Sequence, residues 1–363
     1  MKRIIALLLA LCLLLCGCGK KKDTDPSTEP SDSVTESGSS IQESVGGNTD
    51  VELPAAGYRN PLTGEKLETP WSGQISAVMI NNLKKAMPQH GISQADIFYE
   101  IEVEGDITRC LAVFSDLTGV ASIGPVRSVR TAFSSVAVSY DAPLIHCGGS
   151  TGTNLALGGH YGDSSDKIAN WEHIDADSKH FFRDQDRLNN GVAWEHTLFT
   201  TGEKLQQALK AYGYDTPTDK SYGLNFSEDV ALDGEKAEEV TVKFKSGKST
   251  VLKYDAATKR YTLFMHGTEH IDGNTGKAVT FKNVIAIYTK QWYHADGTHK
   301  YYETIGKGEG YAAINGKIVP ILWSRQSLRS PYIYTLKDGT PLNLEVGNTY
   351  VALVGIKNPI AYK

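Results

Sequence analysis

The chain has 363 residues, of which 40% are hydrophobic and 22% are charged, and its formal net charge is −5. This length predicts about two domains. Residues 57–363 carry a net charge of only −2, which argues against a dedicated nucleic-acid-binding domain. The plentiful aromatic residues exclude a mostly disordered chain, and the lack of a second long apolar run excludes a polytopic membrane protein.

The N-terminal segment has the pattern of an export signal. A basic start, Met1-Lys2-Arg3, precedes an apolar stretch over 4–15 that is too short for a stop-transfer helix. The tetrad Leu15-Cys16-Gly17-Cys18 resembles the lipobox of bacterial lipoproteins. That resemblance implies a signal peptide over 1–17, cleavage after Gly17 and a lipid on Cys18, which would anchor the chain in the membrane.

Residues 18–56 are rich in Ser, Thr, Asp, Glu, Pro and Gly and have few large apolar residues. Such a composition cannot bury enough surface to fold, so we predict a disordered tether. After processing, Cys110 and Cys147 are the remaining unmodified cysteines. Cysteines of an exported protein can pair, but the sequence leaves a Cys110–Cys147 disulfide open.

Residues 57–222 alternate strand-like and helix-like segments, which predicts an N-terminal α/β domain with a mixed sheet. We expect strands at 74–82, 97–103, 108–115 and 142–147. A helix is expected from about Pro125 to Tyr140, and another over 200–212, where Thr200 and Glu203 fit a capping box. Gly105 favours a two-residue hairpin turn, which would place Glu102 opposite Arg109.

From about residue 230 the pattern changes to short strands and turns. Asn315-Gly316 and Asp338-Gly339 are strong turn signals. We therefore predict a mostly antiparallel β domain over 230–363, a barrel or a sandwich, and an α+β fold class for the whole chain.

Arg127 and Arg130 are three residues apart in the expected first turn of a helix, where the helix dipole disfavours cations. Two guanidinium groups beside free N–H groups would make an anion site. The competing interpretation is an internal ion pair with Glu100 or Glu104. The predicted ligand-binding residues are Glu104, Arg109, Arg127, Arg130, His146, Gly148, Gly149 and Ser150.

Residues 148–152 fit the pattern G-x-S-x-G of a nucleophile elbow, with Ser150 as nucleophile and His196 downstream as its base. Gly-Gly-Ser is also a common strand-ending turn, so we favour a non-catalytic interpretation. The acidic residues between 171 and 186 do not match a calcium-binding loop, and we predict neither a metal nor a cofactor. An aromatic stretch, Tyr288, Trp292, Tyr293, Tyr301 and Tyr302, could stack on sugar rings or serve packing.

Several segments in this order resemble the YerB-like lipoproteins of Gram-positive bacteria. They are Asn60-Pro61-Leu62-Thr63-Gly64, Ala77-Val78-Met79-Ile80-Asn81-Asn82, Val103-Glu104-Gly105-Asp106-Ile107-Thr108-Arg109, Ile123-Gly124-Pro125-Val126-Arg127-Ser128, His146-Cys147-Gly148-Gly149-Ser150 and His270-Ile271-Asp272. The resemblance implies two family domains in the order given above, and it implies no reaction.

These observations together predict a lipid-anchored protein on the extracytoplasmic face of the cell membrane. We expect it to bind an anionic cell-envelope glycan or a membrane-protein partner without catalysis, and not to bind nucleic acid. The alternative is a hydrolase or transferase that acts on a cell-envelope polymer.

Overall fold

The computed structural model describes residues 57–149, 179–215, 220–244, 247–294 and 297–363. The predicted signal peptide, Cys18, the tether and Ser150 lie outside the described residues. In the described part of the chain, no helix is both long and apolar enough to cross a membrane.

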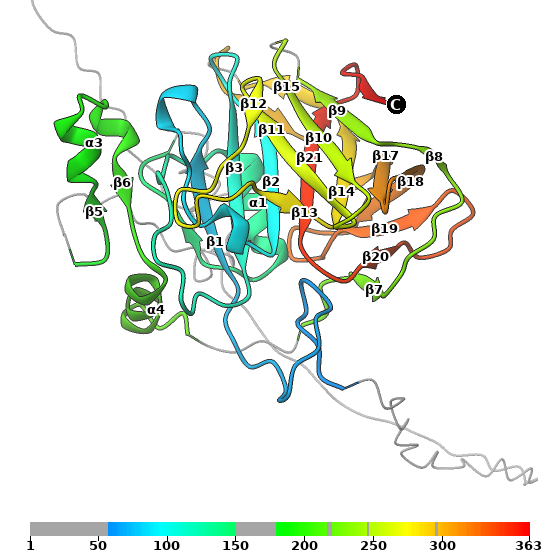
Figure 1. Cartoon of the computed structure of the whole chain (residues 1–363), viewed down its shortest axis with the longest axis horizontal. Coiled ribbons are helices and arrows are strands. Elements are labelled where there is room, and N and C mark those ends of the chain that lie inside the picture. Colours follow the sequence, from blue (N-terminus) through cyan, green and yellow to red (C-terminus); the bar gives the residue numbers. More distant parts are fainter. Residues whose placement is uncertain (1–56, 150–178, 216–219, 245–246, 295–296) are drawn as a thin grey trace, which may run out of the picture. The chain divides into compact units, whose positions relative to one another are not determined.

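A ten-stranded mixed sheet forms the centre of the molecule (Figure 1). Its order is β19 (Ile333–Leu336), β18 (Lys317–Arg325), β17 (Gly306–Ile314), β14 (Asn283–Thr289), β21 (Thr349–Gly355), β2 (Ile97–Glu102), β3 (Thr108–Phe114), β1 (Ser76–Asn81) and β4 (Leu144–Ile145), and β8 (Glu235–Lys236) pairs with β18.

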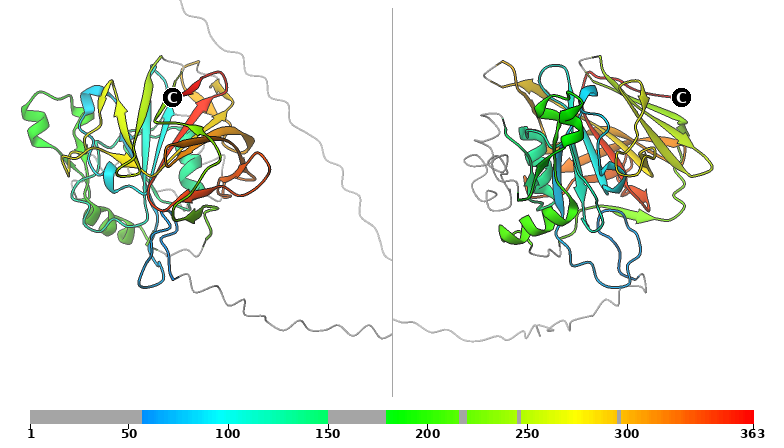
Figure 2. Two further views of the ribbon diagram at one scale, coloured as in Figure 1. Left: turned by 45° about the vertical axis from the view of Figure 1, so that its right-hand side comes forward. Right: turned by 60° about the vertical axis from the view of Figure 1, so that its left-hand side comes forward.

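Strands from both halves of the sequence share this sheet. β21 runs parallel to β2, with Ile97 opposite Thr349, and also parallel to β14. Figure 2 shows the blue-to-cyan strands and the yellow-to-red strands side by side from two further directions. The predicted fold class is confirmed, with a mixed sheet in the first half and mostly antiparallel pairs in the second.

A second, six-stranded sheet covers one face of the first. Phe98 of β2 stacks on Phe281, with ring centroids 6.1 Å apart, and Leu252 and Leu263 belong to the same buried cluster. This face-to-face arrangement is a sandwich. The second sheet comprises β12 (Thr268–Glu269), β11 (Arg260–Met265), β10 (Ser249–Asp255), β9 (Glu239–Lys243), β22 (Ile360–Tyr362) and β13 (Thr280–Phe281).

Helix α1 (Thr131–Ser139) covers the other face of the central sheet, where Phe133 and Val136 pack in a cluster with Tyr99. Every residue of β2 and β3 is therefore buried, including Glu100 and Glu102. β3 lies between β2 and β1, so both of its edges are paired.

The remaining elements lie outside these two sheets and α1. They are η1 (Lys84–Ala86), η2 (Ile92–Gln94), β5 (Phe182–Arg183), α3 (Gln185–Asn189), η6 (Trp194–His196), β6 (Leu198–Phe199), α4 (Gly202–Ala211), β7 (Asn225–Ser227), β15 (Gln291–Tyr293), β16 (Lys300–Tyr302) and β20 (Asn343–Glu345).

The helix expected from about Pro125 begins later. Arg130 is the N-cap of α1 and Arg127 lies outside the helix. Residues before Arg130 are extended because they bond to neighbouring segments: the Arg127 N–H donates to the Met79 carbonyl, and the Val129 N–H donates to the Gly148 carbonyl. Long-range pairing thus overrides the local helical pattern.

The other predicted helix start and the hairpin register are each wrong by one residue. The Thr201 hydroxyl, not Thr200, caps α4 by accepting the Lys204 N–H at 3.1 Å. In the β2–β3 hairpin Arg109 pairs with Ile101, because the turn holds three residues, with Gly105 and Asp106 both at positive φ. Glu102 therefore lies opposite Thr108 instead of Arg109.

Candidate functional site

The predicted arginines meet at the tip of the β2–β3 hairpin. The Nε of Arg130 donates to Oε2 of Glu104 at 2.8 Å, and a second nitrogen of the same guanidinium contacts Oε1. Arg109 donates to Oε1 of Glu104 at 3.3 Å and to the Ser128 carbonyl at 2.5 Å. Both arginines are buried, so Glu104 is the internal ion-pair partner that the competing interpretation anticipated.

In this arginine cluster (Glu104, Arg109, Arg127 and Arg130), the two buried guanidinium groups share one carboxylate. Burial alone would raise the pKa of Glu104, but the hydrogen bond from Arg130 and the charges of both arginines lower it. Burial, with the nearby charge of Arg130, lowers the pKa of Arg109 to about 9. Arg127 is the accessible member, and it pairs with Glu195 at 3.2 Å.

The glycine-rich turn after β4 joins this cluster through its backbone. Gly148 has a φ of +71°. Its carbonyl oxygen accepts a hydrogen bond from the Val129 N–H and lies 2.8 Å from Nδ1 of buried His146. Gly149 forms a bridge with Val129. Residues 146–149 are therefore hydrogen-bonded to the segment that carries Arg127 and Arg130. No disulfide joins Cys110 to Cys147, and Cys110 is buried.

Of the suggested catalytic pair Ser150 and His196, the structure describes only His196. His196 is buried, with Nδ1 2.8 Å from Nδ2 of Asn81 and Nε2 3.4 Å from Glu195. Burial lowers its pKa. The catalytic role of Ser150 with His196 stays a prediction.

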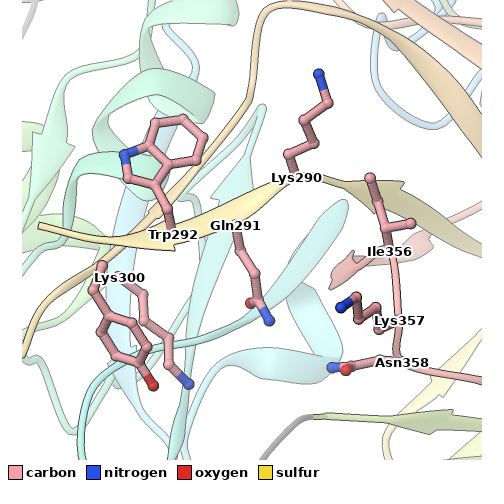
Figure 3. A pocket seen from close by; sticks show the side chains of 8 residues that line it. Lys290, Gln291, Trp292, Lys300, Ile356, Lys357 and Asn358 are labelled. Carbon is pink, nitrogen blue, oxygen red and sulfur yellow. The ribbon is translucent and has the colours of Figure 1, made fainter.

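A further concavity, which we call the Lys300 pocket, was not predicted from the sequence. Its volume is about 830 Å³, and its wall is mainly apolar (Figure 3). It is lined by Lys290, Gln291, Trp292, Tyr293, Lys300, Ile356, Lys357 and Asn358. Figure 3 shows the side chains of Gln291, Lys357 and Asn358 turned toward the same space and Lys290 turned away from it.

Two separate parts of the sequence build this pocket. One is the β15–β16 hairpin, and the other is the turn after β21, where the Asn358 N–H donates to the Gly355 carbonyl at 2.8 Å. Trp292 stacks on Tyr301 with ring centroids 5.9 Å apart, while half of Trp292 stays exposed. The aromatic stretch hinted at this region, but the contribution of residues 356–358 had no sequence signal.

Lys300 forms the charged wall of the pocket. Its Nζ lies 3.1 Å from Oε2 of Glu102, and both side chains are almost fully buried. Glu102 is therefore the partner of Lys300, not of Arg109. Lys290 pairs with Glu303 at 3.5 Å, so Lys357 is the lysine of the pocket that has no ion-pair partner among the described residues.

A further buried carboxyl, Glu100, reaches a smaller cavity of about 440 Å³ between the two sheets. Burial raises its pKa. Its oxygens accept hydrogen bonds from Asn82, Thr108, Thr250 and Tyr350 at 2.6–3.2 Å. Four donors satisfy the carboxyl, so Glu100 joins the two sheets and has little capacity left for a ligand.

The fold and these sites define a protein whose N-terminal and C-terminal halves share one sheet, with a cationic, aromatic pocket. Comparisons with known proteins agree on the class. The two domains described as "Protein of unknown function (DUF3048)" match residues 62–215 (N-terminal domain) and 240–351 (C-terminal domain).

The chain belongs to the YerB-like two-domain family. It is 28% identical over 298 residues to the "Putative lipoprotein YerB" of Bacillus subtilis, which covers 81% of this chain and 85% of that protein. It also matches the crystal structure of the YerB protein from Bacillus subtilis with a TM-score of 0.70 and 27% identity, over 84% of this chain and 99% of that one.

Proposed function

We propose that this protein is a non-catalytic binding protein for an anionic glycan of the cell envelope, anchored by a lipid on Cys18 at the extracytoplasmic face of the membrane. The lipid anchor is supported by the similarity to the Bacillus subtilis protein that is named a putative lipoprotein. The signal pattern and the lipobox-like tetrad support the place of attachment. The tether over 18–56 would hold the folded part on the order of 35 Å from the bilayer.

The observation that carries the binding function is the composition of the Lys300 pocket. Exposed aromatic rings offer apolar faces to sugar rings, and Lys357, which has no ion-pair partner among the described residues, favours an anionic ligand. In the arginine cluster, by contrast, the buried cations already share a carboxylate. We therefore place binding at the pocket, with Arg127 as an accessory cation on the surface.

Cosedimentation with purified cell-wall sacculi tests this proposal. The full-length protein in a nonionic detergent is mixed with sacculi that retain or lack their anionic polymers, at two salt concentrations. We expect pelleting with the intact sacculi, weakened by salt. The variant Tyr293→Ala/Lys357→Ala should pellet at least about fivefold less.

The matched control is Lys243→Ala, which removes an exposed lysine from the second sheet. It should pellet like the wild type. Equal pelleting with both kinds of sacculi, or none with either, would overturn the proposal and favour a membrane-protein partner. Release of soluble fragments from the sacculi would favour the enzymatic alternative.

A further inference from the structure

Three buried polar atoms of the Lys300 pocket have no hydrogen-bond partner among the described residues. They are Nζ of Lys300, Oε1 of Gln291 and Nδ2 of Asn358. Lys300 and Asn358 are more than nine-tenths buried, and the three residues line the same cavity. Buried polar atoms are nearly always paired, because an unpaired one costs about 1–3 kcal/mol. Their convergence points to a ligand that supplies the partners.

The chemistry of these atoms is specific. The ammonium of Lys300 and the amide nitrogen of Asn358 donate, so they require acceptors, whereas the amide oxygen of Gln291 accepts and requires a donor. The charge of Lys300 is already balanced by Glu102. Among the three lysines that line the pocket, Lys357 is therefore the one with no carboxylate partner in the described residues, which matches a ligand with a single negative charge.

The backbone holds the Gln291 amide in place. It lies against Gly355, where a Cβ would come within 2.5 Å of Nε2 and 3.2 Å of Oε1 of Gln291. Gly355 is the last residue of β21, so the amide rests on the rigid central sheet. Tyr293 lies two residues after Gln291 on the same face of β15 and opposite Lys300, and its exposed ring lines the same pocket and offers a flat apolar surface.

We infer that the Lys300 pocket recognises an acidic sugar, that is, a pyranose with a carboxylate and free hydroxyls. The carboxylate accepts from Lys300 and Asn358, a hydroxyl donates to Gln291, and the ring packs on Tyr293. A phosphodiester unit without hydroxyls fits less well, because it offers no donor to Gln291. This inference rests on the proposed function and names its ligand class.

Calorimetric titration of the full-length protein in a nonionic detergent tests the ligand class. The probes are glucuronate, glucose, cyclohexanecarboxylate and inorganic phosphate. We expect glucuronate to bind at least about tenfold more tightly than each of the others, because it alone offers a carboxylate and hydroxyls together. Asn358→Asp should reduce glucuronate binding by about tenfold or more, since a carboxylate then faces the carboxylate of the ligand.

Gln291→Met is the sharper variant, since it keeps the length of the side chain and removes the acceptor. It should weaken glucuronate about fivefold and leave cyclohexanecarboxylate unchanged. An equal loss for both ligands would overturn the assigned role of Gln291. Unchanged melting temperatures for both variants establish that they fold. The matched control is Gln207→Met on the exposed face of α4, which should bind glucuronate like the wild type.

The outcomes separate this inference from the proposed function. If phosphate binds and glucuronate does not, the acidic-sugar inference fails while anionic-polymer binding stands. If wild-type protein pellets with intact sacculi but no probe binds in the pocket, the pocket holds only water and the inference is wrong. If neither sacculi nor probes bind, both proposals fail.

Discussion

The arginine cluster and the Lys300 pocket both contain buried cations beside a carboxylate, but they differ in how far the hydrogen-bonding groups are paired. In the cluster, buried Arg109 and Arg130 donate to Glu104 and to backbone carbonyls. In the pocket, a buried ammonium faces an apolar wall with one ion-pair partner and no hydrogen-bond partner among the described residues. A group of cations is therefore weak evidence for a site, and hydrogen-bonding capacity left unmet is stronger evidence.

The largest expected effect comes from removing the carboxylate of the cluster. Glu104→Gln would leave Arg109 and Arg130 buried without a counter-charge and repelling each other. We expect a loss of about 4 kcal/mol in the free energy of unfolding, measured by urea denaturation. Glucuronate or sacculus binding by the folded fraction should not change. A loss below about 1 kcal/mol would contradict the structural role of the cluster.

A second prediction concerns the pH range over which buried groups lower the stability. His270 is expected to act at a higher pH than the arginine cluster. Burial lowers the pKa of His270 from 6.5 to about 4, so the unfolded chain binds the proton first. The contribution of His270 to the free energy of unfolding is constant above pH 7 and falls as the pH drops from 6.5 to 4, by about 3 kcal/mol. Urea denaturation at several pH values should show a flatter profile for His270→Gln than for the wild type.

The cluster responds to acid at a lower pH. Because the pKa of Glu104 is lowered, its stabilising charge is lost only as the pH falls below its ordinary value of 4.5. Between pH 6.5 and 4.5, Glu104→Gln should therefore follow the slope of the wild type. A flattened slope for Glu104→Gln in that range would assign the acid sensitivity to the cluster and contradict the assignment to His270.

The pocket should respond to substitution in the opposite way from the cluster. Asn358→Leu removes an amide nitrogen that has no partner among the described residues, so we expect the free energy of unfolding to change by less than about 1 kcal/mol, in either direction. The contrast is Asn283→Leu, because Asn283 is fully buried and bonds to Glu345 and Thr349. That variant should lose about 2 kcal/mol or more. Similar losses for the two variants would show that Asn358 is structurally paired.

The smallest effect is expected at the surface of the cluster. The ion pair of Arg127 with Glu195 is partly exposed, so Arg127→Ala should lower the free energy of unfolding by less than about 1 kcal/mol. If Arg127 guides anionic polymers toward the pocket, the variant should pellet less with sacculi at low salt and equally at high salt. A deficit that persists at high salt would instead make Arg127 a direct contact.

Much of the fold could be predicted from the sequence, because strands carry their pattern locally. The strands at residues 76–81, 97–102 and 108–114 lie where apolar runs and alternation placed them, and Asn315-Gly316 forms the turn between β17 and β18. The predictions that were wrong are shifts of one to several residues, at Thr201, at Arg130 and in the Glu104–Asp106 turn. In each case a neighbouring segment decided the outcome.

By itself, the sequence determined the export signal pattern, the α+β class and the family, because composition, periodicity and short motifs are local properties. It also placed Glu104 among the partners of the arginines. Only the tertiary structure decided that β21 joins β2 in one sheet, that Glu102 pairs with Lys300, and that Gln291 and Asn358 share a cavity. These depend on chain segments tens to hundreds of residues apart, whose meeting is set by the burial of the whole core and not by any local pattern.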